Sequence, residues 1–362
     1  MKSVLRLFEK ARPVFQKGGR LAVLKPIYEA LENFLFAPST ATTTAPHVRD
    51  PLDLKRFMSM VILALIPCIV AAFYFFGLRL AAMIAVSYMA GGTVEVLFAV
   101  IRKEDINEGF LVTGMLFPLI MPPTVPLWMV AVGVAFGVFV GKELFGGTGR
   151  NLFNPALVGR CFLALAYPET MSAGWLEPSS ELVGRFFKYV DASSVDAISS
   201  ATPLALAKQG EMCSLSHLLL GSVPGSAGET SAIAIILGGV FLLVTRVANW
   251  RTVVGILGSF TFLAGILHHA QSARFGPASW HVFAGGLLFG AFFMATDPVT
   301  SPTSNAGKWL YGAIIGSTTV LIRNFTGYVE GVTFAILLGN IVAPVLDEMV
   351  FTVRFWRLKS EE

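Results

Sequence analysis

Small hydroxyl side chains gather in a long polar stretch of an otherwise apolar sequence. The run AISSATPLAL, residues 197–206, contains three of them, and the last is Thr202. Because Pro203 follows, the backbone of Thr202 is biased toward extended geometry and away from a helix, which turns its side chain outward. An exposed hydroxyl can act as a nucleophile, although the run alone also fits an ordinary polar loop.

A glycine- and serine-rich motif, GSVPGSAGETSA at residues 221–232, runs into a predicted helix. The free N–H groups and the positive dipole end of a helix N-terminus suit a phosphate or another anionic group. Ser226 and Gly228 are the candidate contacts in this motif. A plain helix cap is the alternative interpretation.

A second motif, FGGTGRNLFNPALVGR at residues 145–160, combines glycines with two asparagines. Glycine permits close backbone approach to a ligand, and the amides of Asn151 and Asn154 can satisfy both donors and acceptors of a bound ligand. The same residues also serve tight turns between membrane spans. Arg160 lies deeper in the following span and therefore needs a partner.

Six acidic residues fall within or beside predicted membrane segments. A charge in hydrocarbon is costly, so such residues usually line wet cavities or pair with a base. Carboxylate oxygens are also the ligands that a hard cation prefers. Two of the six, Glu95 and Glu330, could instead simply pair with a nearby base such as Arg102 or Arg323. The six are Glu29, Glu95, Glu143, Asp297, Glu330 and Asp347.

The chain that must position these groups is predicted to be an integral membrane protein. It is 54% hydrophobic and only 14% charged, with a mean hydropathy of +0.68, which places it outside the soluble globular class. The sequence contains no GxGxxG after a strand and no Walker loop, so no Rossmann unit for NADH is recognisable. Its three cysteines have no metal-ligand spacing.

Ten apolar segments predict an all-helical protein with about ten transmembrane helices. Basic residues gather before the first segment and after the last one, so both termini are predicted to be cytoplasmic, which requires an even number of crossings. The segments are 57–77, 79–101, 109–122, 125–141, 152–167, 230–247, 251–268, 280–296, 307–323 and 330–351.

Two of these segments are short, interrupted by proline and similar to each other. GMLFPLIMPPTVP at residues 114–126 aligns with GLLFGAFFMATDP at residues 286–298. Each half of the chain then holds five spans. Because an odd number of crossings ends on the opposite side of the membrane, the second copy is inverted relative to the first. The pattern predicts a 5+5 inverted repeat with two broken half-helices, an arrangement that transport folds use to build a site at the bilayer midplane. Two proline-capped membrane helices without that role are the alternative.

The predicted organisation has five parts. The polar loop with Thr202 is predicted to lie on the outer side of the membrane, in the periplasm of a bacterium. The leader includes an amphipathic stretch, PIYEALENFLF, with an apolar face suited to a membrane surface. The parts are a cytoplasmic amphipathic leader (1–56), a first five-span repeat (57–167), the periplasmic loop (168–229), a second five-span repeat (230–351) and a cytoplasmic tail (352–362).

Several long motifs, in order along nearly the whole chain, resemble one family. They resemble the B-type subunits of the sodium-translocating NADH:quinone reductases, which share their core with the D-type subunits of the Rnf ferredoxin:NAD reductases. The long leader resembles the B-type and not the D-type proteins. The motifs are HVRDPLDLKRFM (47–58), PLIMPPTVPLWMVAVG (118–133), GKELFGGTGRNLFNPALVGR (141–160), GSVPGSAGET (221–230) and MATDPVTSP (294–302).

The resemblance implies that Thr202 holds FMN covalently through a phosphoester. A dedicated flavin transferase would deliver FMN from FAD, with AMP displaced by the hydroxyl, and the small neighbours Ser199 and Ser200 would leave room for the phosphate. The chain has Ser200 where the family pattern commonly has glycine, which puts the loop geometry in question, because serine adopts positive φ poorly. The resemblance also implies a non-covalent riboflavin, for which Asn151 and Asn154 are the candidate neighbourhood.

The resemblance further implies a quinone site and a sodium path. The quinone is expected at the cytoplasmic membrane surface, near Tyr28, Glu29, Gly141 and Glu143. Sodium is expected to involve the acids Glu29, Glu143, Asp297 and Asp347.

The expected function is that of a membrane subunit in a six-subunit complex of the bacterial inner membrane. It would pass electrons to quinone, coupled to sodium export, while another subunit oxidises NADH. Two alternatives remain: a D-type subunit of a ferredoxin:NAD reductase, and a passive solute channel of similar architecture, which would need no flavin.

Overall fold

The computed structural model describes residues 54–103, 109–173, 175–178, 185–189, 201–272, 275–328 and 330–361, with positions 13 and 15. Helices dominate the described residues and no strand occurs among them, so the predicted all-helical class is confirmed there. The longer helices are α3 (Leu54–Phe76), α4 (Leu78–Arg102), α5 (Gly109–Leu119), α6 (Leu127–Gly141), α7 (Pro155–Ala166), α11 (Ala232–Val244), α12 (Trp250–Ala270), α15 (Asn305–Phe325) and α16 (Val332–Glu361).

Short helical segments connect and interrupt these helices. The expected periplasmic loop contains three helices that the sequence analysis did not predict, α8, α9 and α10. The eighth predicted span is divided among α13, α14 and a π-helical turn, η4. The short segments are η2 (Glu143–Phe145), α8 (Pro168–Ala173), α9 (Pro203–Lys208), α10 (Leu215–Leu220), α13 (Ala278–Phe283), α14 (Leu287–Phe289) and η4 (Gly290–Met294).

Five helical stretches in the described part are long and apolar enough to cross a membrane. They include α3, α4, α12 and most of α16, together with α6 extended through η2. The helices α5, α7 and α11 are apolar but shorter. The helix α16 continues to Glu361, well past the predicted end at residue 351, because no proline or glycine interrupts the chain after Pro344.

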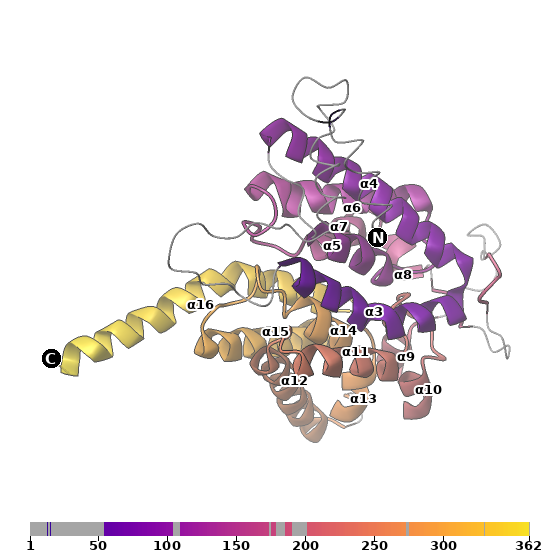
Figure 1. The fold of residues 1–362 in the computed structure, drawn as a ribbon. Coiled ribbons are helices and arrows are strands. Elements are labelled where there is room, and N and C mark those ends of the chain that lie inside the picture. The colour runs from indigo at the N-terminus through magenta and orange to yellow at the C-terminus, as the bar shows by residue number, and fades with distance from the viewer. Residues whose placement is uncertain are drawn as a thin grey trace.

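The helices form two groups that meet along α3 and α16. In Figure 1, α4 to α7 lie together on one side, and α11, α12 and α15 lie on the other. The helix α3 packs on α5 of its own group and extensively on α11 of the other, while α16 packs on α15 and also on α7. The outer part of α16 projects away from the body toward the C-terminus (Figure 1).

The break after α5 is supported by a buried arginine at the start of α4. The Nε of Arg79 donates to the carbonyl oxygen of Pro123 at 2.7 Å, and its Nη2 donates to that of Val125 at 2.9 Å. The glycine-rich loop before α11 supports the same break, since the N–H of Gly228 donates to the carbonyl oxygen of Leu119 at 2.7 Å. Carbonyls released by the broken helix are therefore paired without water.

A second arginine supports the break between α13 and α14. The Nη1 of Arg323, near the end of α15, donates to the carbonyl oxygen of His281 at 2.7 Å, and its Nη2 donates to that of Ala284 at 3.0 Å. The N–H of Gly286 donates to Glu330 Oε1 at 2.5 Å. Both interruptions thus depend on buried ionic side chains from neighbouring segments.

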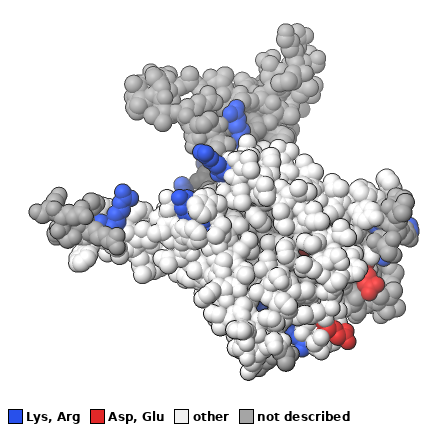
Figure 2. Space-filling view, turned by 90° about the horizontal axis from the view of Figure 1, so that it is seen from below, with Lys and Arg blue, Asp and Glu red and all other residues white. Residues whose placement is uncertain are grey.

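The face seen in Figure 2 is mostly uncharged, with lysine, arginine, aspartate and glutamate side chains toward its margins. Large apolar side chains are exposed on several helices, including Val244 of α11 and Phe262 of α12, which are 76% and 72% exposed. An apolar outer surface of this kind is expected of helices that face lipid or other membrane proteins.

Close packing of α12 against α15 generates a test of the fold. A Cβ atom at Gly316 would overlap the backbone carbonyl oxygen of Ile256, whereas a Cβ at Gly258 would meet open space. We expect Gly316→Ala to destabilise the protein by about 1–3 kcal/mol, because the backbone of α12 would have to move. Thermal unfolding in detergent should show a lower Tm for Gly316→Ala and no loss for the control Gly258→Ala. Equal Tm values for the two variants would contradict this packing.

Candidate functional site

Thr202 lies at the N-terminus of α9. Its backbone is extended, with φ of −65° and ψ of 155°, as the following proline predicted, and its Oγ1 accepts a hydrogen bond from the N–H of Ala205 at 3.3 Å. The side chain therefore caps a helix that the sequence analysis missed. Pro203 occupies the first position of this helix, where a missing N–H costs nothing.

Thr202 lines a cavity with a volume of about 470 Å³. Its walls come from α7, α8, α9, α13, the loop before α11 and the start of α16. Aromatic rings at Trp175, Phe283, Tyr328 and Phe334 contribute to them. A mostly apolar cavity of this size with a few polar groups is typical of a small-molecule site.

A buried cluster of charged side chains forms the polar wall of the same cavity. Arg160, on α7, bridges two carboxylates: its Nη1 donates to Glu229 Oε1 at 3.2 Å, and its Nη2 makes a short ion pair with Glu330 Oε2. The Nη2 also lies 3.4 Å from the hydroxyl of Ser226. We name Arg160, Glu229 and Glu330 the bridged cluster.

The two carboxylates of the bridged cluster converge at Gly286. A Cβ atom at Gly286 would lie 2.5 Å from the Oε1 atoms of both Glu229 and Glu330, so any side chain there would disrupt the cluster. Burial and the nearby Glu330 raise the pKa of Glu229, in the loop before α11, to about 8, and Arg160 opposes them. The carboxyl of Glu229 therefore changes its protonation close to neutral pH.

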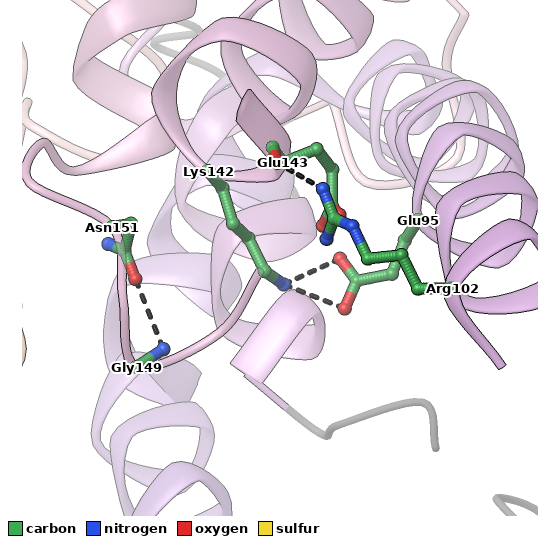
Figure 3. Close-up of polar contacts among 6 residues, drawn as sticks. All are labelled: Glu95, Arg102, Lys142, Glu143, Gly149 and Asn151. Carbon is green, nitrogen blue, oxygen red and sulfur yellow. Dashed lines mark hydrogen bonds and ion pairs between the residues drawn. The ribbon is translucent and has the colours of Figure 1, made fainter. Parts of the chain in front are cut away.

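Two further ion pairs join α4 to the residues that follow α6, Lys142 and Glu143 (Figure 3). The Nζ of Lys142 donates to both oxygens of Glu95, at 2.7 and 2.6 Å, and Arg102 Nη1 donates to Glu143 Oε2 at 2.7 Å. Glu95 does pair with a base, but that base is Lys142 and not Arg102. Glu330, likewise, forms its ion pair with Arg160 and not with Arg323.

The two asparagines of the second motif hold local backbone structure. Asn154 caps α7 through a bond from the N–H of Ala156, and Asn151 accepts from the N–H of Gly149 at 3.3 Å, as Figure 3 shows for Asn151. Both line a second cavity of about 60 Å³, together with Lys142 and Asp297. That volume would hold a few water molecules.

The candidate sodium and quinone residues that the structure describes lie at separate positions. Asp297 accepts hydrogen bonds from the N–H of Val299 and the hydroxyl of Thr300. Asp347, on α16, accepts four from the N–H and hydroxyl groups of Thr303 and Ser304. No cluster of three or more potential metal-ligating His, Cys, Asp or Glu side chains occurs in the described ranges.

Close approach of α7 explains the glycine at position 141. A Cβ there would come within 3.1 Å of the Cα of Pro155. Four other candidate residues, Ser199, Ser200, Tyr28 and Glu29, lie outside the described residues.

The structure thus brings Thr202 together with Ser226 at one cavity, and Asn151 and Asn154 together with Asp297 at another. Gly228, in contrast, packs against the broken end of α5. Sequence reasoning missed the bridged cluster as a unit, since its members come from distant segments. The available signal was a charged residue deep in a predicted span, Arg160, with an acid inside the glycine-rich motif.

Comparison with known proteins gives consistent relatives over nearly the full length. Residues 41–355 match the model of the NQR2, RnfD, RnfE family. A protein of Pseudomonas aeruginosa strain PAO1 is 40% identical over 95% of this chain and 96% of its own. Proteins of Azotobacter vinelandii and Klebsiella pneumoniae strain 342 are 39% and 37% identical, over 96% and 98% of both chains. All three are named as the B-type subunit of a Na(+)-translocating NADH-quinone reductase.

The Lys142–Glu95 pair generates a stability test, because each side chain is less than a tenth exposed. Removing one partner leaves an uncompensated buried charge, so Glu95→Leu and Lys142→Met should each destabilise the protein by about 3–5 kcal/mol. The double variant should recover much of that loss. The Tm values of the wild type, the two single variants and the double variant, measured in detergent, form a double-mutant cycle. Strictly additive losses of stability would show that the two side chains are not coupled.

Proposed function

The chain belongs to the NQR2, RnfD, RnfE family, and we propose that it is the B-type subunit of a sodium-translocating NADH-quinone reductase. Support comes from relatives with that name that match it over 95–98% of its length at 37–40% identity. In this role the chain is one membrane subunit of an oxidoreductase complex that reduces quinone. We assign NADH oxidation to another subunit. We propose that the complex has six subunits and lies in the bacterial inner membrane.

Thr202 is the proposed attachment point for FMN, and the observation that carries this assignment is the cavity beside it. The volume, the aromatic walls and the polar side chains fit a planar heterocycle whose phosphate end is bonded to Thr202 Oγ1. In the attachment step, Oγ1 attacks the FMN phosphorus of FAD, the pyrophosphate bond breaks and AMP leaves, while the hydroxyl proton is lost to base. A separate flavin transferase would catalyse this step.

Bound FMN would accept and pass on electrons between a partner subunit and quinone. The apolar and aromatic side chains of the cavity would exclude water from the ring, and the helix cap made by Thr202 would fix the attachment point. The neighbourhood of Asn151 and Asn154, beside the second cavity, is the proposed place of a non-covalent riboflavin, and we assign no electron-transfer step to it.

The proposed quinone site is the cytoplasmic end of α6, where Gly141 and Glu143 lie, together with the leader residues Tyr28 and Glu29. The Arg102–Glu143 pair would hold the carboxylate in place there. Asp297, which lines the second cavity, and Asp347 are the proposed sodium-path residues of the membrane part.

We propose that the helices form a ten-span inverted repeat, with α3 to α7 as one copy and α11 to α16 as the other. The packing supports this, because α3 contacts α11 and α7 contacts α16, the helices that the repeat would make equivalent. In the matching orientation, both termini would lie in the cytoplasm and the Thr202 cavity on the periplasmic side.

The FMN assignment predicts the behaviour of Thr202 variants. The complex with Thr202→Ala should lose all covalent flavin, because alanine has no oxygen for the phosphoester, whereas Thr202→Ser should keep a fraction. In-gel fluorescence under denaturing conditions, with the protein amount measured by immunoblot, reads this out. Sodium-stimulated quinone reduction should disappear together with the fluorescent band.

Thr230 provides the matched control, since it is a buried threonine lining the same cavity. Thr230→Ala should keep the fluorescent band. A wild-type protein that is present but carries no fluorescence would overturn the FMN assignment and would favour a solute channel.

A further inference from the structure

The bridged cluster is an unusual wall for a mostly apolar cavity. Arg160, Glu229 and Glu330 are each at most about one-sixth exposed as side chains, and all three line the cavity that contains Thr202. Ion pairs placed only for stability can be replaced by apolar residues at little loss, so a buried cluster facing a ligand cavity calls for a functional reason.

Neighbouring segments fix the geometry of the cluster. Arg160 comes from α7, Glu229 from the loop before α11 and Glu330 from the segment just before α16. The N–H of Gly286 donates to Glu330 Oε1, and Arg160 bonds the other oxygen of the same carboxylate. Because several segments hold these charged groups in place, the groups cannot reorient as water molecules would. Their electric field at the cavity is therefore preorganised.

We propose that the bridged cluster sets the reduction potential of the flavin attached to Thr202, with Arg160 facing the ring and not the phosphate. This inference rests on the proposed FMN attachment. It assigns a positioning role in electron transfer to three residues that take no part in the attachment chemistry.

The charge of each residue predicts the direction in which it shifts the reduction potential. An electron arrives from a one-electron carrier of a partner subunit, no bond forms or breaks, and the ring becomes more negative. A fixed guanidinium in a cavity of low dielectric favours that added charge, whereas a fixed carboxylate opposes it. Arg160 therefore raises the potential, and ionised Glu330 lowers it.

The ionisation of Glu229 makes its effect depend on pH. The charged groups around it are Arg160 on α7, Glu330 before α16 and Arg323 on α15, which donates to the backbone carbonyl of His281 on α13. Since the pKa of Glu229 is about 8, the carboxyl is neutral below that pH and negative above it. Its opposing effect on the ring should appear only as the pH rises past 8.

The test is a spectroelectrochemical titration of the covalent flavin in the purified complex. Arg160→Gln should lower the potential and Glu330→Gln should raise it, each by about tenfold in the equilibrium constant, or about 59 mV for a one-electron couple. Glu229→Gln should raise the potential at pH 9 more than at pH 6. Arg251→Gln, which removes an arginine at the start of α12 that does not line the cavity, should leave the potential unchanged.

In-gel fluorescence separates this inference from the FMN assignment. Retained fluorescence in Glu330→Gln with an unshifted potential overturns the role of the cluster and leaves the attachment intact. A different result would also overturn the proposal: Arg160→Gln loses the attached flavin, while Arg160→Lys and Glu330→Gln keep the wild-type potential. That result would show that Arg160 holds the phosphate. If Arg160→Gln does not accumulate, Glu330→Gln and Glu229→Gln decide the outcome through their upward shifts.

Discussion

Polar groups inside an apolar helical protein must find partners within the protein, and the arrangement of this chain follows from that constraint. Each interruption of a helix releases backbone carbonyls. Arg79 takes those after α5 and Arg323 takes those between α13 and α14. The loop before α11 pairs with the end of α5 as well, which brings Ser226 and Glu229 to the cavity wall. The same loop thus supports a helix break and forms part of the cavity wall.

The buried ion pairs of the described residues lie at two places with different consequences. Lys142–Glu95 and Arg102–Glu143 pair one base with one acid between α4 and the residues that follow α6. In the bridged cluster, one guanidinium serves two carboxylates, and the balance with Arg323 depends on whether Glu229 carries a proton. The second arrangement can therefore change its net charge near neutral pH. A cavity with an adjustable charged wall suits a redox cofactor better than a passive solute.

The sequence predicted those features that depend on local chemistry. Apolar runs located the helices, Pro203 predicted the extended backbone of Thr202, and the position of Arg160 predicted a buried partner. It did not predict that Glu95 pairs with Lys142, since that choice depends on the rotation of α4 relative to α6. The helix α9 was missed because a single turn capped by threonine has no periodic signal. The bridged cluster combines three distant segments, and only the packed structure shows their proximity.

The central claim is that the cavity beside Thr202 holds a flavin whose ring lies against Arg160. A density map of the whole complex, at a resolution that separates side chains, tests it most directly. The account predicts continuous density from Thr202 Oγ1 to a tricyclic ring within contact distance of the Arg160 guanidinium. A map of the intact complex with a ring placed away from Arg160, or with no density attached to Thr202, would contradict it.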